Sequence, residues 1–275
     1  MIVPGRGPSA GRRRPVRKRF GQHFLEPVWA DKVVAAIAPL PGDRFLEIGP
    51  GTGVLTSRLA PRVASLVAVE IDRDLAADLA RHVPPNADIV PADFLELDLS
   101  RFLNGPLRVA GNLPYNISSP ILFKLLGASS RSANLVDATL MLQREVAERL
   151  VAPVGSHEYG VLGILTAIQA DVRRLIDLPP GAFRPPPRVR SAVVRLTFRT
   201  PVVGGATRTE LERMVRVMFT QRRKTLVNAL RPFADARGRT SISAVSAAGL
   251  NPGRRPETLS IKELVLLASV FADQG

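Results

Sequence analysis

Short, almost wholly apolar segments alternate with helix-like segments through the first half of this chain. The apolar segments span residues 44–48, 65–71, 87–90, 107–110 and 138–142, and segments with helical spacing span residues 26–38, 54–60 and 72–82. Near-continuous apolar strands separated by helices are typical of a parallel sheet that is covered on both faces. The pattern therefore predicts an α/β fold with a mostly parallel sheet.

The second half of the chain predicts a change of architecture. Two further strands are expected over residues 164–175 and 192–198, and the long Pro-rich loop at 178–187 between them favours an antiparallel addition at the sheet edge. After Thr200 all segments show helical spacing, with turn residues between them, at residues 209–219, 225–233, 242–248 and 260–272. We therefore predict an α/β domain over residues 21–200 and a small all-helical domain over residues 201–275.

Positive charge is concentrated at the two ends of the chain. The net charge of +14 divides into +7 over residues 1–25, −4 over residues 26–170 and +11 over residues 171–275. A mildly acidic body between basic ends is typical of a protein that holds a polyanion, although an Arg-rich genome also produces such a charge. Residues 1–20 mix Arg and Lys with Gly and Pro, so we expect a disordered basic arm rather than the amphipathic helix of a mitochondrial transit peptide.

The composition excludes several classes of protein. The chain has no cysteine and only three scattered histidines, which excludes disulfides and a cysteine nucleophile and argues against a metal site. No apolar stretch approaches the ~18 residues that cross a bilayer, and no signal-peptide core follows the basic N-terminus. We expect a soluble, cytoplasmic, monomeric protein without a membrane or metal partner.

A glycine-rich motif with the sequence EIGPGTG ends the first apolar strand of the sheet, at residues 47–53. Ligands bind at this end of open α/β sheets, and Gly49 and Gly51 allow a close backbone approach. Glu70 ends the next strand, where its carboxylate can accept both hydroxyls of a ribose. Because the spacing is G-x-G-x-G and not the pyrophosphate-binding G-x-G-x-x-G, we predict a nucleoside cofactor without phosphates, S-adenosylmethionine.

The third strand is followed by Asp93, which can accept a hydrogen bond from an adenine amino group. Phe94 or Ile71 would then pack against the adenine ring. Alternatively, Asp93 only caps a helical turn, because Asp is also favoured at that position.

An NLPY motif follows the fourth strand, at residues 112–115. The side-chain carbonyl of Asn112 and the main-chain carbonyl of Leu113 can each accept one proton of an exocyclic amine, which favours a pyramidal and more nucleophilic nitrogen. Tyr115 can stack on the base, which must be unstacked to enter. Capping of a turn by Asn and Tyr is the alternative, and the nearby glycine loop argues against it.

Several motifs in register resemble the adenine dimethyltransferases of ribosomal RNA: FGQHFL at 20–25, EIGPGTG, Glu70, Asp93, NLPYNIS at 112–118, MLQREVAERL at 141–150 and FRPPPRV at 183–189. The resemblance covers residues 20–270 and implies a class I methyltransferase domain that uses S-adenosylmethionine. It implies cofactor contacts at His23, Leu25, Gly49, Glu70, Asp93 and Asn112, and a target-base site at Asn112, Tyr115 and Phe183. His23 stands where the family most often has Asn, so a plain interface histidine is the alternative for that position.

The C-terminal sequences FTQRRKTL at 219–226 and RPETLS at 255–260 resemble the small-subunit branch of this family. The resemblance implies dimethylation of two adjacent adenosines in a hairpin loop near the 3′ end of 16S rRNA, within an immature small ribosomal subunit. Candidate RNA contacts are Arg184, Arg188, Arg222, Arg223 and Lys224. The alternatives are a large-subunit (23S) rRNA methyltransferase of the antibiotic-resistance branch, a mainly non-catalytic assembly factor and a small-molecule methyltransferase, which would leave the basic C-terminal third unexplained.

Overall fold

The computed structural model describes residues 23–272, so the predicted basic arm at 1–20 lies outside the described residues. A seven-stranded sheet with the order β4-β3-β2-β5-β6-β9-β7 forms its centre. Its strands are β2 (Arg44–Ile48), β3 (Ser65–Glu70), β4 (Ala87–Pro91), β5 (Leu107–Asn112), β6 (Leu135–Gln143), β7 (Ala170–Leu178) and β9 (Ser191–Phe198). The first five are mutually parallel, and β9 is antiparallel to both β6 and β7. The predicted, mostly parallel α/β sheet is therefore confirmed.

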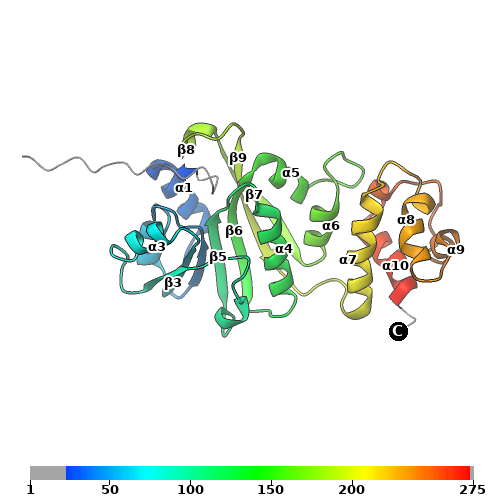
Figure 1. Ribbon diagram of the computed structural model, residues 1–275, viewed down its shortest axis with the longest axis horizontal. Coiled ribbons are helices and arrows are strands. Elements are labelled where there is room, and N and C mark those ends of the chain that lie inside the picture. The colour runs from blue at the N-terminus through cyan, green and yellow to red at the C-terminus, as the bar shows by residue number, and fades with distance from the viewer. Residues whose placement is uncertain (1–22, 273–275) are drawn as a thin grey trace, which may run out of the picture.

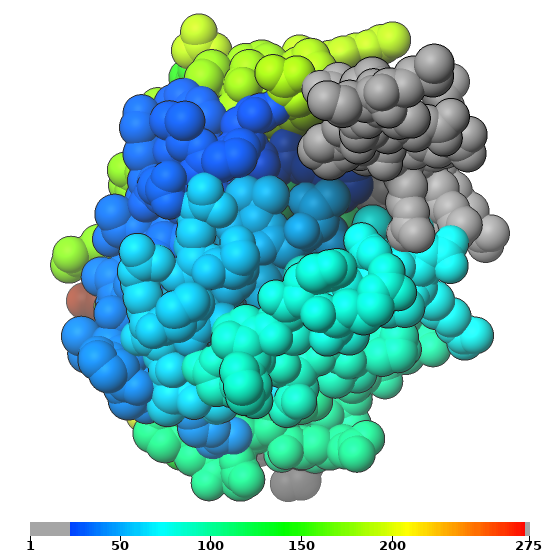
Figure 2. Space-filling view, turned by 90° about the vertical axis from the view of Figure 1, so that its left-hand side faces the viewer, coloured from blue at the N-terminus to red at the C-terminus, as the bar shows by residue number. Residues whose placement is uncertain are grey.

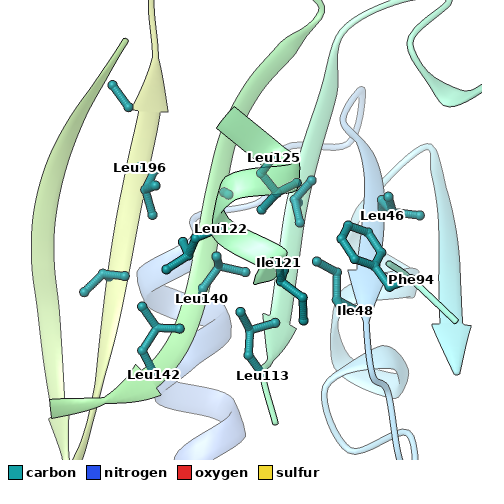
Figure 3. Close-up of a cluster of buried hydrophobic side chains, with 14 of the residues drawn as sticks. Leu46, Ile48, Phe94, Leu113, Ile121, Leu122, Leu125, Leu140, Leu142 and Leu196 are labelled. Atoms are coloured by element: carbon teal, nitrogen blue, oxygen red, sulfur yellow. The ribbon is translucent and has the colours of Figure 1, made fainter. Parts of the chain in front are cut away.

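Helices cover both faces of this sheet (Figure 1). They are α1 (Pro27–Ile37), α2 (Thr56–Leu59), α3 (Arg73–Leu79), α4 (Ser118–Ser129), α5 (Arg144–Leu150) and α6 (Val161–Ala167), with short 3-10 turns η2 (Ala60–Arg62), η3 (Leu99–Phe102) and η4 (Pro180–Ala182). On one face, Ile121 and Leu125 of α4 pack against strand side chains such as Leu140 (Figure 3). On the other face, Val33 and Ile37 of α1 pack with side chains of β2 and β3. Burial on both faces explains why the strands are apolar at nearly every position.

One predicted element begins at the wrong place. The strand expected from residue 164 begins at Ala170, and Ile164 and Leu165 belong to α6. Both side chains, with Ile168, are buried against the C-terminal helices. An apolar run of this length suits either a strand or a buried helix, and here the contact with the C-terminal helices favours the helix.

The C-terminal helices form a separate core beside α6 (Figure 1). They are α7 (Gly205–Phe219), α8 (Leu226–Asp235), α9 (Ser241–Ala247) and α10 (Ile261–Ala272), with the 3-10 turn η5 (Pro256–Thr258). Met214, Met218, Leu230 and Leu267 are fully buried there. Because α6 and Tyr159 contribute to the same core, this helical unit also includes residues that precede the predicted boundary at residue 201.

A second, very small sheet joins the start of the described chain to the Pro-rich loop. β1 (Phe24–Leu25) pairs antiparallel with β8 (Phe183–Arg184), with Leu25 opposite Phe183. Figure 2 shows the yellow-green segment that contains β8 lying against the blue N-terminal segment. Strands of only two residues show no periodicity, so the sequence did not predict this pair.

Within residues 23–272, no helix has the length and apolar character needed to cross a bilayer.

Candidate active site

One cavity lies where the parallel strands β2, β3, β4 and β5 end. Because the carboxyl ends of parallel strands share one edge of the sheet, residues that are distant in sequence meet there. The cavity wall includes most of the predicted site residues: His23, Leu25, Gly49, Gly51, Glu70, Ile71, Asp93, Phe94, Asn112, Leu113 and Tyr115.

The glycine loop at one side of this cavity requires its glycines. Gly49, Gly51 and Gly53 have φ angles of 66°, 57° and 79°, in the left-handed region that side chains disfavour. A Cβ atom on Gly53 would lie 2.2 Å from Leu79 Cδ1, and one on Gly51 would lie 3.0 Å from the Phe24 ring. The loop is thus packed closely between α3 and β1.

Glu70 holds the glycine loop and faces the cavity. Its Oε2 accepts from the Gly51 backbone N–H at 2.9 Å, and its Oε1 accepts from the Asp72 N–H at 2.9 Å. Burial raises the pKa of Glu70, although both backbone donors favour the carboxylate. Each oxygen retains acceptor capacity beyond its backbone partner, so the carboxylate can also accept two vicinal hydroxyls.

Glu47 lines the same cavity and was not singled out from the sequence. Its carboxyl is 1% exposed and accepts from Thr56 Oγ1 at 2.8 Å. Burial, with a smaller contribution from Glu70, raises the pKa of Glu47 to about 7, while the Thr56 hydrogen bond opposes the rise. In the sequence, Glu47 could have been recognised as an acidic residue within a mostly apolar strand.

Asp93 and Phe94 also line the cavity. Asp93 Oδ1 accepts from the Leu95 N–H at 2.8 Å, so the turn-capping role is present alongside any ligand role. Phe94 packs between strand side chains (Figure 3), and Lys124 Nζ of α4 donates to the Leu95 carbonyl at 2.7 Å. Lys124 thereby ties this turn to the helix that follows the NLPY motif.

The NLPY segment presents its acceptors to the cavity. Asn112 Nδ2 donates to the His23 backbone oxygen at 2.7 Å, which leaves the Asn112 carboxamide oxygen as the free acceptor. Leu113 is buried and its N–H donates to Met141. Tyr115 is hydrogen-bonded through its hydroxyl to Ser191 Oγ at 2.7 Å, and burial raises the pKa of its phenol.

His23 reaches the cavity, as expected, whereas Phe183 does not. The His23 ring lines the cavity and stacks on Tyr115, with a centroid distance of 5.5 Å and an interplanar angle of 26°. Phe183 is 1% exposed, packs in the core beneath β1 and is absent from the cavity wall. In this structure Phe183 cannot contact a base, because pairing of β8 with β1 directs its side chain into the core.

The predicted RNA contacts divide into partnered and exposed cations. Arg222 Nε donates to Glu257 Oε2 at 2.8 Å, and Arg222 Nη1 donates to the His157 carbonyl at 2.8 Å, so Arg222 is committed within the protein. Arg223 and Lys224 are exposed. Arg188 is exposed, and Arg184 is exposed and forms an ion pair with Glu26.

In the part of the chain that the structure describes, no cluster of His or acidic residues is placed to hold a metal ion.

Comparison with known proteins agrees with this geometry. Among curated relatives, Ribosomal RNA small subunit methyltransferase A of Aromatoleum aromaticum is 44% identical over 93% of this chain and 94% of its own length. The protein of the same name from Syntrophotalea carbinolica is also 44% identical, over 93% of this chain and 96% of its own.

Two solved structures of related methyltransferases also resemble this chain. A dimethyladenosine transferase from Plasmodium falciparum matches with a TM-score of 0.73 and 26% identity, covering 89% of this chain and 96% of its own. The 23S rRNA methyltransferase ErmE matches with a TM-score of 0.66 and 27% identity, covering 91% of this chain and 100% of its own. These neighbours confirm the class I methyltransferase fold with its helical C-terminal part. The family model for ribosomal RNA adenine dimethylases matches residues 13–272, and the chain therefore belongs to that family.

Proposed function

We propose that this protein dimethylates the exocyclic amino groups of two adjacent adenosines in a hairpin loop near the 3′ end of 16S rRNA, on an immature small subunit in the cytoplasm. The methyl donor in this proposal is S-adenosylmethionine. The orientation of Asn112 is the observation that carries it. Its amide nitrogen donates to the His23 backbone oxygen, so its carboxamide oxygen remains to accept from an amine in the cavity.

The residues around the cavity fit the proposed cofactor. Gly49 and Gly51 line the cavity and carry no side chain, Glu70 can accept two ribose hydroxyls, and Asp93 lines the same cavity and can accept from an adenine amine. When bound, S-adenosylmethionine supplies a methyl group on a positively charged sulfur. Glu47 and Glu70 both line this cavity, so each carboxyl, when ionised, attracts a cationic ligand.

The NLPY residues then act on the target amine. The Asn112 side-chain oxygen and the Leu113 carbonyl each accept a hydrogen bond from one of its N–H groups, which localises the nitrogen lone pair and directs it toward the methyl group. Tyr115 supports the base, and Ser191 fixes the plane of the tyrosine through its hydroxyl. No general base is needed before the transfer, because the amine keeps its protons until its nitrogen has gained the methyl group; the positively charged nitrogen then releases one proton to water.

The polyanionic substrate is supported by the exposed cations. Arg223 and Lys224 lie on the C-terminal helical unit, while Arg184 and Arg188 lie on the Pro-rich loop beside β1. The curated relatives at 41–44% identity carry a small-subunit name, which favours the small subunit over the large subunit. Similarity to ErmE keeps a large-subunit substrate as the second candidate.

Transfer of a tritiated methyl group tests the proposal. Immature small subunits are expected to accept label, with up to four methyl groups per subunit, and naked large-subunit RNA is expected to accept little. The matched control is Asn112→Ala, which removes the acceptor and is expected to bind subunits without labelling them. Preferred labelling of large-subunit RNA would reject the small-subunit assignment, and binding without any turnover by the wild type would favour an assembly factor.

A further inference from the structure

The side chain of His23 occupies a stacking surface that the proposed reaction requires. Its imidazole lies 5.5 Å from the Tyr115 ring, centroid to centroid, at an interplanar angle of 26°. Its Nδ1 lies 2.7 Å from the Pro185 carbonyl oxygen. Because a carbonyl only accepts, Nδ1 carries the proton and donates it. A planar nitrogen heterocycle is therefore stacked on Tyr115 and donates to a main-chain carbonyl, as an adenine amine would.

A target base cannot enter between these two rings. Stacked aromatic rings have centroids at least about 4.5 Å apart, so a sandwiched base needs about 9 Å between the outer rings. The observed spacing between His23 and Tyr115 is 5.5 Å. A base that uses this face of Tyr115 must therefore replace the imidazole.

The imidazole can leave without disturbing Asn112. The Asn112 amide is held by the backbone oxygen of His23 and not by its ring. Rotation of the His23 side chain breaks one ring stack and the hydrogen bond to Pro185, and it leaves the backbone contact in place.

We propose that His23 is a stand-in for the target base: its imidazole covers Tyr115 in the RNA-free protein and is displaced when the adenine enters. This inference rests on the proposed function, because it needs Tyr115 to be the stacking partner of the base. It assigns the His23 side chain to the base site, whereas the family resemblance implied a cofactor contact. The cost of displacing the imidazole reduces the apparent affinity for every entering base by the same factor.

Three substitutions at this position test the inference. His23→Ala removes the competing ring and keeps the backbone oxygen that orients Asn112. His23→Phe keeps a stacking ring and serves as the matched control, and His23→Asn has a small planar amide that stacks weakly. The measurements are the KM of immature small subunits in methyl transfer and the Kd of S-adenosylmethionine by calorimetry.

For His23→Ala, the KM for subunits is expected to fall about two- to tenfold, the range for loss of one aromatic stack. His23→Asn should behave like His23→Ala, His23→Phe should keep the wild-type KM or raise it, and the cofactor Kd should stay within twofold in all three. A raised or unchanged KM for His23→Ala, an equal fall in His23→Phe, or a weakened cofactor affinity would each overturn the inference. If the wild type does not methylate small subunits, the proposed function fails, which is a separate result.

Discussion

The basic loop before α8 provides a quantitative test of RNA contact. Arg222, Arg223 and Lys224 are consecutive in sequence, yet only Arg223 and Lys224 are exposed, while Arg222 is paired with Glu257 and the His157 carbonyl. Neutralising one phosphate contact reduces the slope of log K against log salt by about 0.7 to 0.9 units. The double variant Arg223→Gln/Lys224→Gln is therefore expected to reduce the slope by about 1.4 to 1.8 units.

This change of slope has a visible consequence. When the salt concentration rises from 50 to 200 mM, the ratio of wild-type to variant affinity for subunits is expected to fall by roughly tenfold, because the two slopes differ by about 1.6 units. Fluorescence titration of immature small subunits across a salt series measures it. The Kd of S-adenosylmethionine should be unchanged, because both residues lie outside the cavity wall.

Arg222→Gln is the control: it removes one positive charge at the position next to the two that the double variant neutralises. Because Arg222 holds Glu257 and the loop at His157, its removal is expected to lower the melting temperature and to leave the salt slope almost unchanged. The reasoning is refuted if the double variant folds and keeps the wild-type slope. It is also refuted if Arg222→Gln reduces the slope as much as the double variant does.

Three further substitutions test other parts of the structure. Glu70→Gln should weaken binding of S-adenosylmethionine by about 1–3 kcal/mol, because a buried acceptor is lost; an unchanged affinity in titration calorimetry would remove Glu70 from the ribose role. Asn112→Ala should reduce methyl transfer by about 10²-fold or more while subunit affinity stays nearly intact, since its oxygen acts mainly as the amine becomes pyramidal; a parallel fall in binding would mean that its role is structural. Arg254 and the Ser260 N–H lower the pKa of Glu263 to about 2, so its carboxylate stabilises the fold above pH ~4.5, and this stability is lost as pH falls toward 2. Thermal unfolding of Glu263→Gln should show a lower melting temperature at pH 7 and a weaker loss of stability between pH 5 and 3, and an unaltered acid profile would contradict the assignment.

Local pattern was sufficient for most of the sheet and for several residues that line the cavity. The strand predicted at 44–48 has those bounds, and the helix predicted at 26–38 is α1 at 27–37. A strand buried on both faces must be apolar at successive positions, which is a property of a few neighbouring residues and is legible in the sequence. Glu70 and Asp93 could be assigned to one site because strand ends in a parallel sheet share an edge.

Contacts between distant segments could not be predicted in this way. The sequence suggested Phe183 for the base site, but pairing of β8 with β1 buries its ring. In the sequence, Arg222 could not be distinguished from Arg223 and Lys224 as a candidate RNA contact. The structure pairs it with Glu257, which lies thirty-five positions later. The buried Glu47, whose pKa rises to about 7, depends on the side chains that surround it.

The sequence by itself therefore determined the class of fold, the positions of its main strands along the chain and several residues of the cavity edge, because these follow from short-range periodicity and from motifs at strand ends. Only the tertiary structure decided which side chains of those motifs are free to act. His23 on Tyr115, Ser191 at the tyrosine hydroxyl and Arg222 on Glu257 are each set by segments far apart in the chain. Whether a polar side chain is available to a ligand depends on what packs against it, and no local pattern records that.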